Sequence, residues 1–221
     1  MASEAVDVVV ARVSRGGDSA ADLRAVATPS ALRPAVASLR EASVDVIAYA
    51  STTSGYAIGP AAEADLVRTL QHLAGVPVVT SGLAATRALK SFGVRRVALV
   101  HPPWFEAEMG ELGASYFRDQ GIDVDTLMAT SIPKDPDQVR PEQVIDYISD
   151  AVDASTEAVF IAGTGFRAAA TVEELERRTG QLVLEANQVL LWSILAATGT
   201  KLQINGYGSL FRGSGPVVAG F

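Results

Sequence analysis

The sequence predicts an α/β protein made of two pseudosymmetric, Rossmann-like halves, each a parallel sheet flanked by helices, with a site in the cleft between them. Three observations lead to this prediction. Short β-branched and apolar runs alternate with longer helical patterns, which is typical of parallel sheets covered by helices. Hydrophobic residues make up 48% of the 221 residues, enough for a sizeable core. Residues 44–59 and 156–171 repeat one pattern of acidic residue, apolar strand, small-residue turn and helix.

The apolar runs define the expected strands, and the segments between them define the expected helices. Strands are expected at residues 6–13, 44–50, 76–79, 96–101, 124–128, 158–162 and 182–184. Helices are expected at residues 29–41, 61–73, 83–92, 105–120, 141–154, 168–178 and 187–198. Pro141 opens its helix, while Gly93, Gly121 and Gly199 close theirs, which is the usual asymmetry of helix ends. Residues 130–140 are rich in Pro, Asp and Lys and indicate an exposed loop.

A second matched pair of segments extends the internal repeat. Residues 80–93 and 186–199 agree in length, and both end in glycine. The repeat predicts one half from residues 1–93 with 187–221 and the other from residues 94–186. It makes Ser51 equivalent to Gly163, and Thr80 to Ala186, at the carboxyl ends of strands, where open α/β sheets bind ligands. The alternative is a coincidental likeness of two βα units.

Residue types that are absent or rare limit the chemistry. The chain has no cysteine, which excludes disulfides, thiolate metal sites and a cysteine nucleophile. Its two histidines exclude a histidine-rich metal cage, and no metal is expected. A net charge of -7 and a pI near 4.9 argue against nucleic acid or an anionic membrane as partner. The sequence lacks a membrane-spanning apolar run and a signal-peptide pattern at its start, so a cytoplasmic location is expected.

The hydroxyl segment, residues 51–54, is the first candidate ligand site. Ser51, Thr52, Thr53 and Ser54 follow a buried strand and precede the helix expected from residue 61. Hydroxyls and loop amides in such a place bind carboxylates or phosphates. The alternative is that these side chains only end the strand and cap local turns. The segment is not a Walker loop, because no Gly-Lys-Ser/Thr follows at the required spacing.

The glycine segment, residues 163–165, is the matching candidate in the second half. Gly163, Thr164 and Gly165 would let a ligand approach the backbone closely, although a helix-packing turn would show the same pattern. Thr80 and Asn187 begin helices at equivalent strand ends, where they either cap the helix or contact the ligand.

His101 is the candidate proton carrier, because it ends a strand beside a Pro-Pro turn and imidazole titrates near neutral pH. The alternative is a loop histidine hydrogen-bonded to the backbone. Trp104 would be a wall or a lid of the cleft. Arg167 could pair an anion, but an exposed surface charge is the simpler interpretation, and His72 is expected at the surface.

Five stretches of the sequence carry a likeness to a known superfamily. They are DVIAYASTTSGYAIG, PVVTSGLAATRALKSFGVRRVALV, VFIAGTGFRA, ANQVLLW and GYGSLF. With these stretches in this order, the chain resembles the aspartate/glutamate racemase superfamily, in its maleate isomerase and arylmalonate decarboxylase branch. The resemblance implies two pseudosymmetric α/β halves, a cofactor-free site between them, a small carboxylic acid as ligand and self-association into a homo-oligomer.

The resemblance also locates departures from the family pattern. Family members place a cysteine after the equivalent strand of one or both halves, where this chain has Ser51 and Gly163. At the position of the family's aromatic residue after the fourth strand, this chain has Pro103 and Trp104. The family's first strand has no counterpart in this chain. A serine hydroxyl without an activating neighbour is a much poorer base than a thiolate at neutral pH. By resemblance, the proton-transfer chemistry is therefore altered.

The resemblance thus implies a cofactor-independent isomerase, racemase or decarboxylase of a small (di)carboxylic acid, with non-cysteine chemistry. Ser51 would be a nucleophile and His101 the proton carrier, but hydrolysis by this pair lacks an identifiable acid. By resemblance, the hydroxyls would hold a carboxylate and stabilise a developing enediolate. The expected substrate-binding residues are Thr52, Thr53, Ser54, Thr80, Gly163, Thr164, Gly165 and Asn187. The alternatives are a carboxylate-binding protein without catalysis and a structural subunit.

Overall fold

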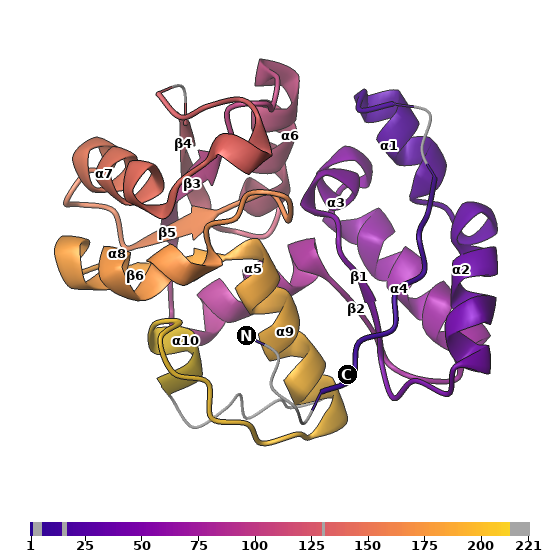
Figure 1. The fold of residues 1–221 in the computed structure, drawn as a ribbon. Coiled ribbons are helices and arrows are strands. Elements are labelled where there is room, and N and C mark those ends of the chain that lie inside the picture. The colour runs from indigo at the N-terminus through magenta and orange to yellow at the C-terminus, as the bar shows by residue number, and fades with distance from the viewer. Residues whose placement is uncertain (2–5, 15–16, 130, 213–221) are drawn as a thin grey trace.

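Two parallel sheets lie in two lobes of the chain (Figure 1). The computed structural model describes residues 1, 6–14, 17–129 and 131–212. In the first lobe, β1 (Ile47–Tyr49) pairs with β2 (Val78–Thr80). In the second lobe, the strands pair in the order β4 (Asp123–Met128), β3 (Arg96–His101), β5 (Ala158–Ile161) and β6 (Leu182–Glu185). Every pairing is parallel, so the expected α/β class with parallel sheets flanked by helices is confirmed.

Helices flank both sheets (Figure 1). Those of the first lobe are α1 (Ala20–Val26), α2 (Pro29–Glu41), α3 (Thr52–Ile58), α4 (Pro60–Ala74) and α5 (Ser81–Ser91). The remaining helices are α6 (Ala107–Arg118), η1 (Pro136–Gln138), α7 (Pro141–Ala151), η2 (Ala169–Thr171), α8 (Val172–Thr179), α9 (Ala186–Thr198) and α10 (Ser209–Arg212). α5 and α9 pack against each other between the lobes, and α9 also contacts strands of both sheets (Figure 1). A helix in that position is buried on most sides, which explains the nearly continuous apolar sequence of α9.

The central strands of the second sheet have no solvent-facing side. Val97, Leu99, Val100 and Phe160 are completely buried, as expected for apolar strands covered by helices on both faces. The parallel register places the carboxyl ends of β5 and β6 together, since Ile161 pairs with Glu185. The carboxyl ends of β1 and β2 meet in the same way in the first sheet. These strand ends carry the hydroxyl segment, the glycine segment and the first residues of α5 and α9.

The strand expected at residues 6–13 does not form, because residues 6–14 contain no strand or bridge. Val8, Val9 and Val10 are 69%, 50% and 72% exposed. A strand of valines is stabilised mainly by packing against neighbouring side chains, and these valines make little such contact. The β-branched composition therefore indicated a strand that the described part of the chain does not contain.

The sequence analysis also missed three short helices, α1, α3 and α10. α3 begins at Thr52, so the hydroxyl segment starts a helix and is not an open loop. Gly55 in the middle of α3 lowers the helix propensity of this segment, so the sequence pattern does not indicate a helix there. A Cβ at Gly55 would lie 2.8 Å from Glu63 Oε1, so a larger residue there would displace the Glu63 carboxyl group. The helix expected at residues 168–178 is divided into η2 and α8.

Candidate active site

The hydroxyl segment is held by its own hydrogen bonds at the start of α3. Ser51 is the N-cap, and its Oγ accepts the backbone N–H of Ser54 at 3.2 Å. The Oγ of Ser54 accepts bonds from Ser51 Oγ and from the Tyr49 hydroxyl, both at 2.9 Å. Thr52 and Ser54 are buried, whereas Ser51 and Thr53 are partly exposed. The capping interpretation therefore holds for Ser51, and only Ser51 and Thr53 present hydroxyls that a ligand could reach.

The glycine segment approaches the hydroxyl segment from the second lobe. Thr164 Oγ1 donates a hydrogen bond to the carbonyl of Ala50 at 3.4 Å, directly before Ser51. Gly163 is buried with φ +88°, and a Cβ there would lie 3.0 Å from Pro102 Cγ. Both observations require glycine at this position. Thr164 is partly exposed and Gly165 is exposed, so they border the space between the lobes.

The two predicted helix-start residues have different surroundings. Asn187, in the first turn of α9, is partly exposed, and its Nδ2 donates to the carbonyl of Thr164 at 3.2 Å. Thr80, the N-cap of α5, is only 1% exposed, so a ligand cannot touch it in this conformation. The structure thus brings Ser51, Thr53, Thr164 and Asn187 together around the junction of the two segments and leaves Thr80 inside the first lobe.

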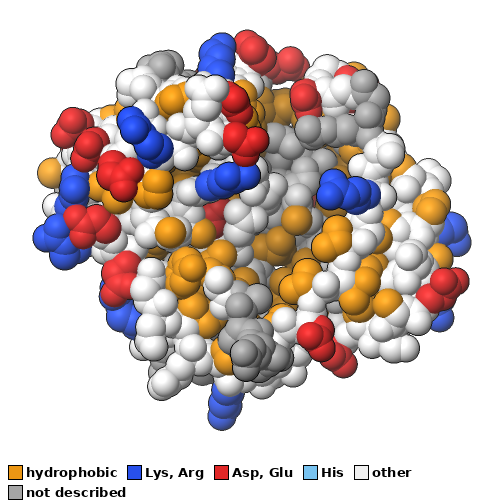
Figure 2. All heavy atoms as spheres, in the orientation of Figure 1, with side chains coloured by type: hydrophobic (Ala, Val, Ile, Leu, Met, Phe, Trp, Pro, Cys, Tyr) orange, Lys and Arg blue, Asp and Glu red, His pale blue; other side chains and the backbone are white. Residues whose placement is uncertain are grey.

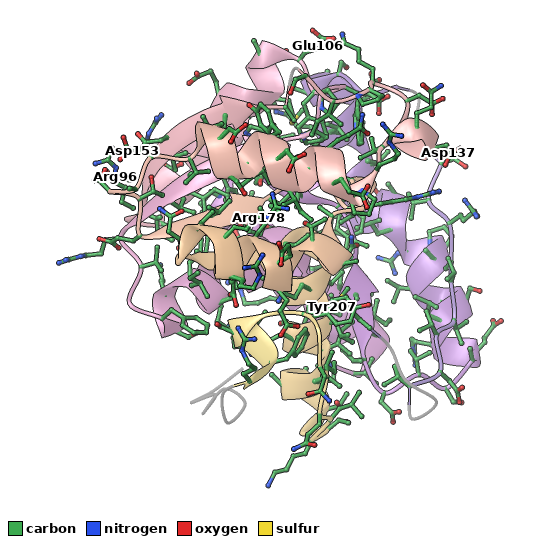
Figure 3. The ribbon with its side chains drawn as sticks, turned by 60° about the vertical axis from the view of Figure 1, so that its left-hand side comes forward. Arg96, Glu106, Asp137, Asp153, Arg178 and Tyr207 are labelled. Carbon is green, nitrogen blue, oxygen red and sulfur yellow. The ribbon has the colours of Figure 1, made fainter. Side chains whose placement is uncertain are left out.

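A hollow separates the lobes on the face shown in Figure 2, with apolar side chains along part of its wall and basic side chains on both sides. Arg167, close to the glycine segment, pairs with Asp137 at 2.7 Å and is 69% exposed, as expected for a surface charge. Figure 3 shows Asp137 at the opposite end of the second sheet from Arg96 and Asp153. The Arg167–Asp137 pair therefore lies at the carboxyl end of the sheet, but its guanidinium already has an anionic partner.

His101 does not occupy the position expected of a proton carrier. Its side chain is completely buried, with the ring centroid 6.3 Å from Tyr56 and 5.6 Å from Phe105. Burial lowers its pKa to about 4, and the backbone of Gly110 opposes only part of this shift. The imidazole is therefore neutral at neutral pH and out of reach of a ligand. The Ser51–His101 pair considered from the sequence is not formed, because Ser51 bonds within its own segment.

Trp104 is part of the packing of the second lobe. Its ring lies 5.6 Å from that of Phe166, edge to face, and it contacts the core behind the glycine segment. The side chain is half-buried. It therefore supports the wall on the side of the glycine segment, and the structure gives it no lid-like position. His72 is exposed, as the sequence predicts.

Two buried glutamates beside the site were not identified from the sequence. Glu185, the N-cap of α9, accepts the backbone N–H groups of Asn187 and Gln188. Burial raises its pKa to about 7, although these N–H bonds oppose the shift. The sequence does contain a signal for this N-cap, because Gln188 lies three residues after Glu185, which is the spacing of a capping box.

Glu63 on α4 is the second buried glutamate. Burial raises its pKa, and the hydroxyl of Tyr116, which donates to Glu63 Oε2, lowers it in part. A Cβ at Gly82 would lie 2.7 Å from Glu63 Oε2, so this carboxyl fills the space beside the first turn of α5. The signal in the sequence was its place on the buried stripe of α4, in register with Leu66 and Leu70.

Glu185 gives a prediction for the pH dependence of stability. Its pKa rises from an ordinary 4.5 to about 7 in the folded protein, so the folded state binds more protons across that interval. The free energy of unfolding of the wild type should therefore fall relative to Glu185→Gln as pH rises from 4.5 to 7. The change should reach about 3 kcal/mol, since each pKa unit corresponds to about 1.4 kcal/mol. Urea unfolding of both proteins from pH 4.5 to 8 measures this change. If the unfolding free energies of the two proteins depend on pH in the same way, the raised pKa of Glu185 is contradicted.

The described residues hold no group of three or more His, Cys, Asp or Glu side chains that could bind a metal ion. Among the same residues, no helix has the length and apolar character needed to cross a membrane.

Comparison with known proteins places these features in a family. The family model for arylmalonate decarboxylase matches residues 29–211. The chain is 24% identical over 183 residues to the maleate isomerase of Geobacillus stearothermophilus, covering 79% of this chain and 72% of that protein. It is also 24% identical over 179 residues to the arylmalonate decarboxylase of Bordetella bronchiseptica, covering 78% and 73% respectively.

Solved structures of the same two kinds of enzyme share this fold. A double mutant of arylmalonate decarboxylase in the liganded form aligns with a TM-score of 0.79 at 20% identity, covering 90% of this chain and 85% of that one. A mutant maleate isomerase from Pseudomonas putida S16, solved with maleate, aligns with a TM-score of 0.78 at 20% identity, covering 89% and 80%. The resemblance inferred from the sequence is thereby confirmed, and the chain belongs to the arylmalonate decarboxylase family.

Proposed function

We propose that this chain is a cofactor-independent enzyme of the isomerase or lyase class that acts on a small carboxylic acid between its two lobes. One observation carries the proposal. The hydroxyl segment and the glycine segment, at carboxyl strand ends of different sheets, meet through the bond from Thr164 to the carbonyl of Ala50. Strand ends of this kind are where α/β proteins bind small ligands. Family membership and the curated relatives, a maleate isomerase and an arylmalonate decarboxylase, support the same class of substrate.

The absence of a thiol favours decarboxylation within this class. A maleate cis-trans isomerase from Nocardia farcinica, 22% identical, has been solved with a covalently bound succinylcysteine intermediate. This chain has no cysteine that could form such a bond. Decarboxylation of a malonate needs no nucleophile. The bond between the central carbon and one carboxylate breaks, carbon dioxide leaves, and the electron pair passes to the remaining carboxylate as an enediolate.

The partly exposed hydroxyls supply what such a reaction requires. Hydrogen bonds from Ser51, Thr53 and the glycine segment would stabilise the negative charge that develops on the enediolate. The Ser51 hydroxyl would then give its proton to the carbon, and water would restore it. A hydroxyl is a weaker acid than a thiol but a far stronger acid than the C–H bond formed, so this transfer is downhill. The missing thiol should slow the reverse step most, because removal of a proton from carbon needs a base.

Incubation in deuterium oxide with phenylmalonate, malonate, maleate and amino acids, followed by NMR, tests the proposal. We expect phenylmalonate to lose carbon dioxide and its product to carry deuterium at the new C–H position. We expect maleate to bind without isomerisation. If no substrate in the panel reacts while several bind with saturation, the chain is a carboxylate-binding protein and the enzymatic proposal fails.

Further properties complete the proposal. We propose that residues 1–93 with 187–221 and residues 94–186 are the two halves, which the two separate sheets support. We propose a cytoplasmic protein that forms a homo-oligomer and binds neither nucleic acid nor membranes, in keeping with its net charge of -7. Val8, Val9 and Val10 are large exposed apolar side chains suited to a subunit contact. Analytical ultracentrifugation distinguishes an oligomer from a monomer.

A further inference from the structure

Glu185 is a buried carboxylate whose hydrogen bonds extend beyond the cap of α9. It has no exposed surface. Its Oε2 accepts the backbone N–H of Asn187 at 2.9 Å and that of Gln188 at 3.0 Å. Its Oε1 accepts Asn187 Nδ2 at 2.9 Å. An ionised carboxylate has enough lone pairs for all three donors, whereas protonation of Oε1 makes that oxygen a weaker acceptor for Asn187 Nδ2 and adds a hydrogen that needs its own acceptor.

Asn187 connects this carboxylate to the glycine segment. Its Nδ2 carries two hydrogens, one directed to Glu185 Oε1 and the other to the carbonyl of Thr164 at 3.2 Å. Thr164 in turn donates from its hydroxyl to the carbonyl of Ala50 at 3.4 Å. Four residues from three separate parts of the chain are thus joined in one series of hydrogen bonds. The series begins at a buried carboxyl group and ends beside Ser51.

The surroundings of the carboxylate are polar but mostly uncharged. Gln188 accepts the backbone N–H of Glu185 and donates to the carbonyl of Tyr207, which Figure 3 labels near α10. The charged groups of the neighbouring helices α8 and α10 are engaged in ion pairs, among them that of Glu176 with Arg212 at 2.6 Å. Glu176 also accepts the backbone N–H of Val183 in β6, so it binds the same strand without joining the series.

We propose that Glu185 is a positioning residue of the carboxylate site, acting through Asn187 to hold Thr164 and so the glycine segment against the hydroxyl segment. This inference rests on the proposed function only in taking the junction of the two segments as the ligand site. Glu185 itself has no exposed surface and does not contact the ligand. Its effect on the ligand is transmitted by the orientation of the Asn187 amide.

Glu185→Gln separates this role from helix capping. The oxygen of a glutamine can still accept the two backbone N–H groups that begin α9. Its NH₂ group, however, faces Asn187 Nδ2, so two donors meet and the Asn187 side chain must turn away from Thr164. Asn187→Ala removes the same link from the other side. Glu176→Gln is the matched control, because it changes a glutamate that bonds β6 outside the series.

The first measurement needs no ligand. In the wild type, the amide resonance of Thr164 should shift as pH passes through neutrality, and amide hydrogen exchange of residues 163–165 should be slow. In Glu185→Gln and Asn187→Ala the pH-dependent shift should disappear and exchange should accelerate about tenfold. Glu176→Gln should behave as the wild type. Unchanged exchange and an unchanged titration in Glu185→Gln would overturn the proposal.

The second measurement is the dissociation constant of phenylmalonate by calorimetry. We expect Glu185→Gln and Asn187→Ala each to weaken binding about tenfold and the double variant to be no weaker than either, because both break one series. Additive losses would overturn the proposal. If the wild type binds neither phenylmalonate nor maleate, the proposed function fails, while the exchange measurement still decides the role of Glu185.

Discussion

Replacing Ser51 with alanine should lower the turnover of phenylmalonate about 100-fold, which is the lower end of what a positioned proton donor contributes. Ser51 is the partly exposed hydroxyl beside the point where the two segments meet. Its loss also removes the N-cap of α3, which should lower the free energy of unfolding by about 1 kcal/mol. Steady-state kinetics and urea unfolding measure the two effects separately.

Two variants control for the structural part of this effect. Ser51→Thr keeps both a hydroxyl and a capping oxygen, so it should retain most of the activity. Ser51→Gly keeps most of the capping stability but no hydroxyl, so it should be as inactive as Ser51→Ala. Turnover of Ser51→Ala within twofold of the wild type would remove Ser51 from the reaction.

Introducing a thiol should have opposite outcomes at Ser51 and Gly163, the two positions where the resemblance implies a cysteine. Ser51→Cys places the thiol at a partly exposed N-cap in an extended backbone conformation that any residue adopts. A thiolate is a much better base than a hydroxyl at neutral pH. Ser51→Cys should therefore accelerate exchange of the α-hydrogen of phenylacetate-type products on the order of 100-fold over the wild type. Deuterium incorporation followed by NMR measures the rate.

Gly163→Cys should gain no such activity. The residue has φ +88° and its Cβ would meet Pro102 Cγ at 3.0 Å, so any side chain strains the backbone there. We expect a loss of about 2 kcal/mol in unfolding free energy. Gly163→Ala is the matched control and should lose a similar amount, since the strain comes from Cβ and not from sulfur. A stable, active Gly163→Cys would show that the segment can take a different backbone conformation.

Strands and helices could be predicted from the sequence where local pattern and tertiary burial agree. The β3 strand at Arg96–His101 forms with the expected bounds, as does α2 at Pro29–Glu41. Thr28 caps α2 and Pro29 begins it, so the local signals suffice. The pattern at residues 6–13 was equally apolar, but no local signal reveals whether a strand has a neighbour to pair with.

The site was predictable in part. Ser51, Thr164 and Asn187 could be placed at strand ends because small polar residues after apolar runs indicate strand ends, and their role in binding a ligand stays a prediction. His101 was misjudged because its sequence context predicts a strand end but not which elements cover it. Tyr56 from α3 and Phe105 bury its ring. Glu185 was missed because the role proposed for it depends on a link through Asn187 to Thr164, which is 21 positions away from Glu185 and in another segment.

A crystal structure with phenylmalonate or malonate bound tests the central claim, that the two segments form one carboxylate site. We expect one carboxylate within hydrogen-bond distance of the Ser51 or Thr53 hydroxyl and, at the same time, of the backbone of residues 163–165. We also expect the bonds from Asn187 to Thr164 and from Thr164 to Ala50 to be retained. A ligand that contacts only one of the two segments, or binds elsewhere on the protein, would contradict the account.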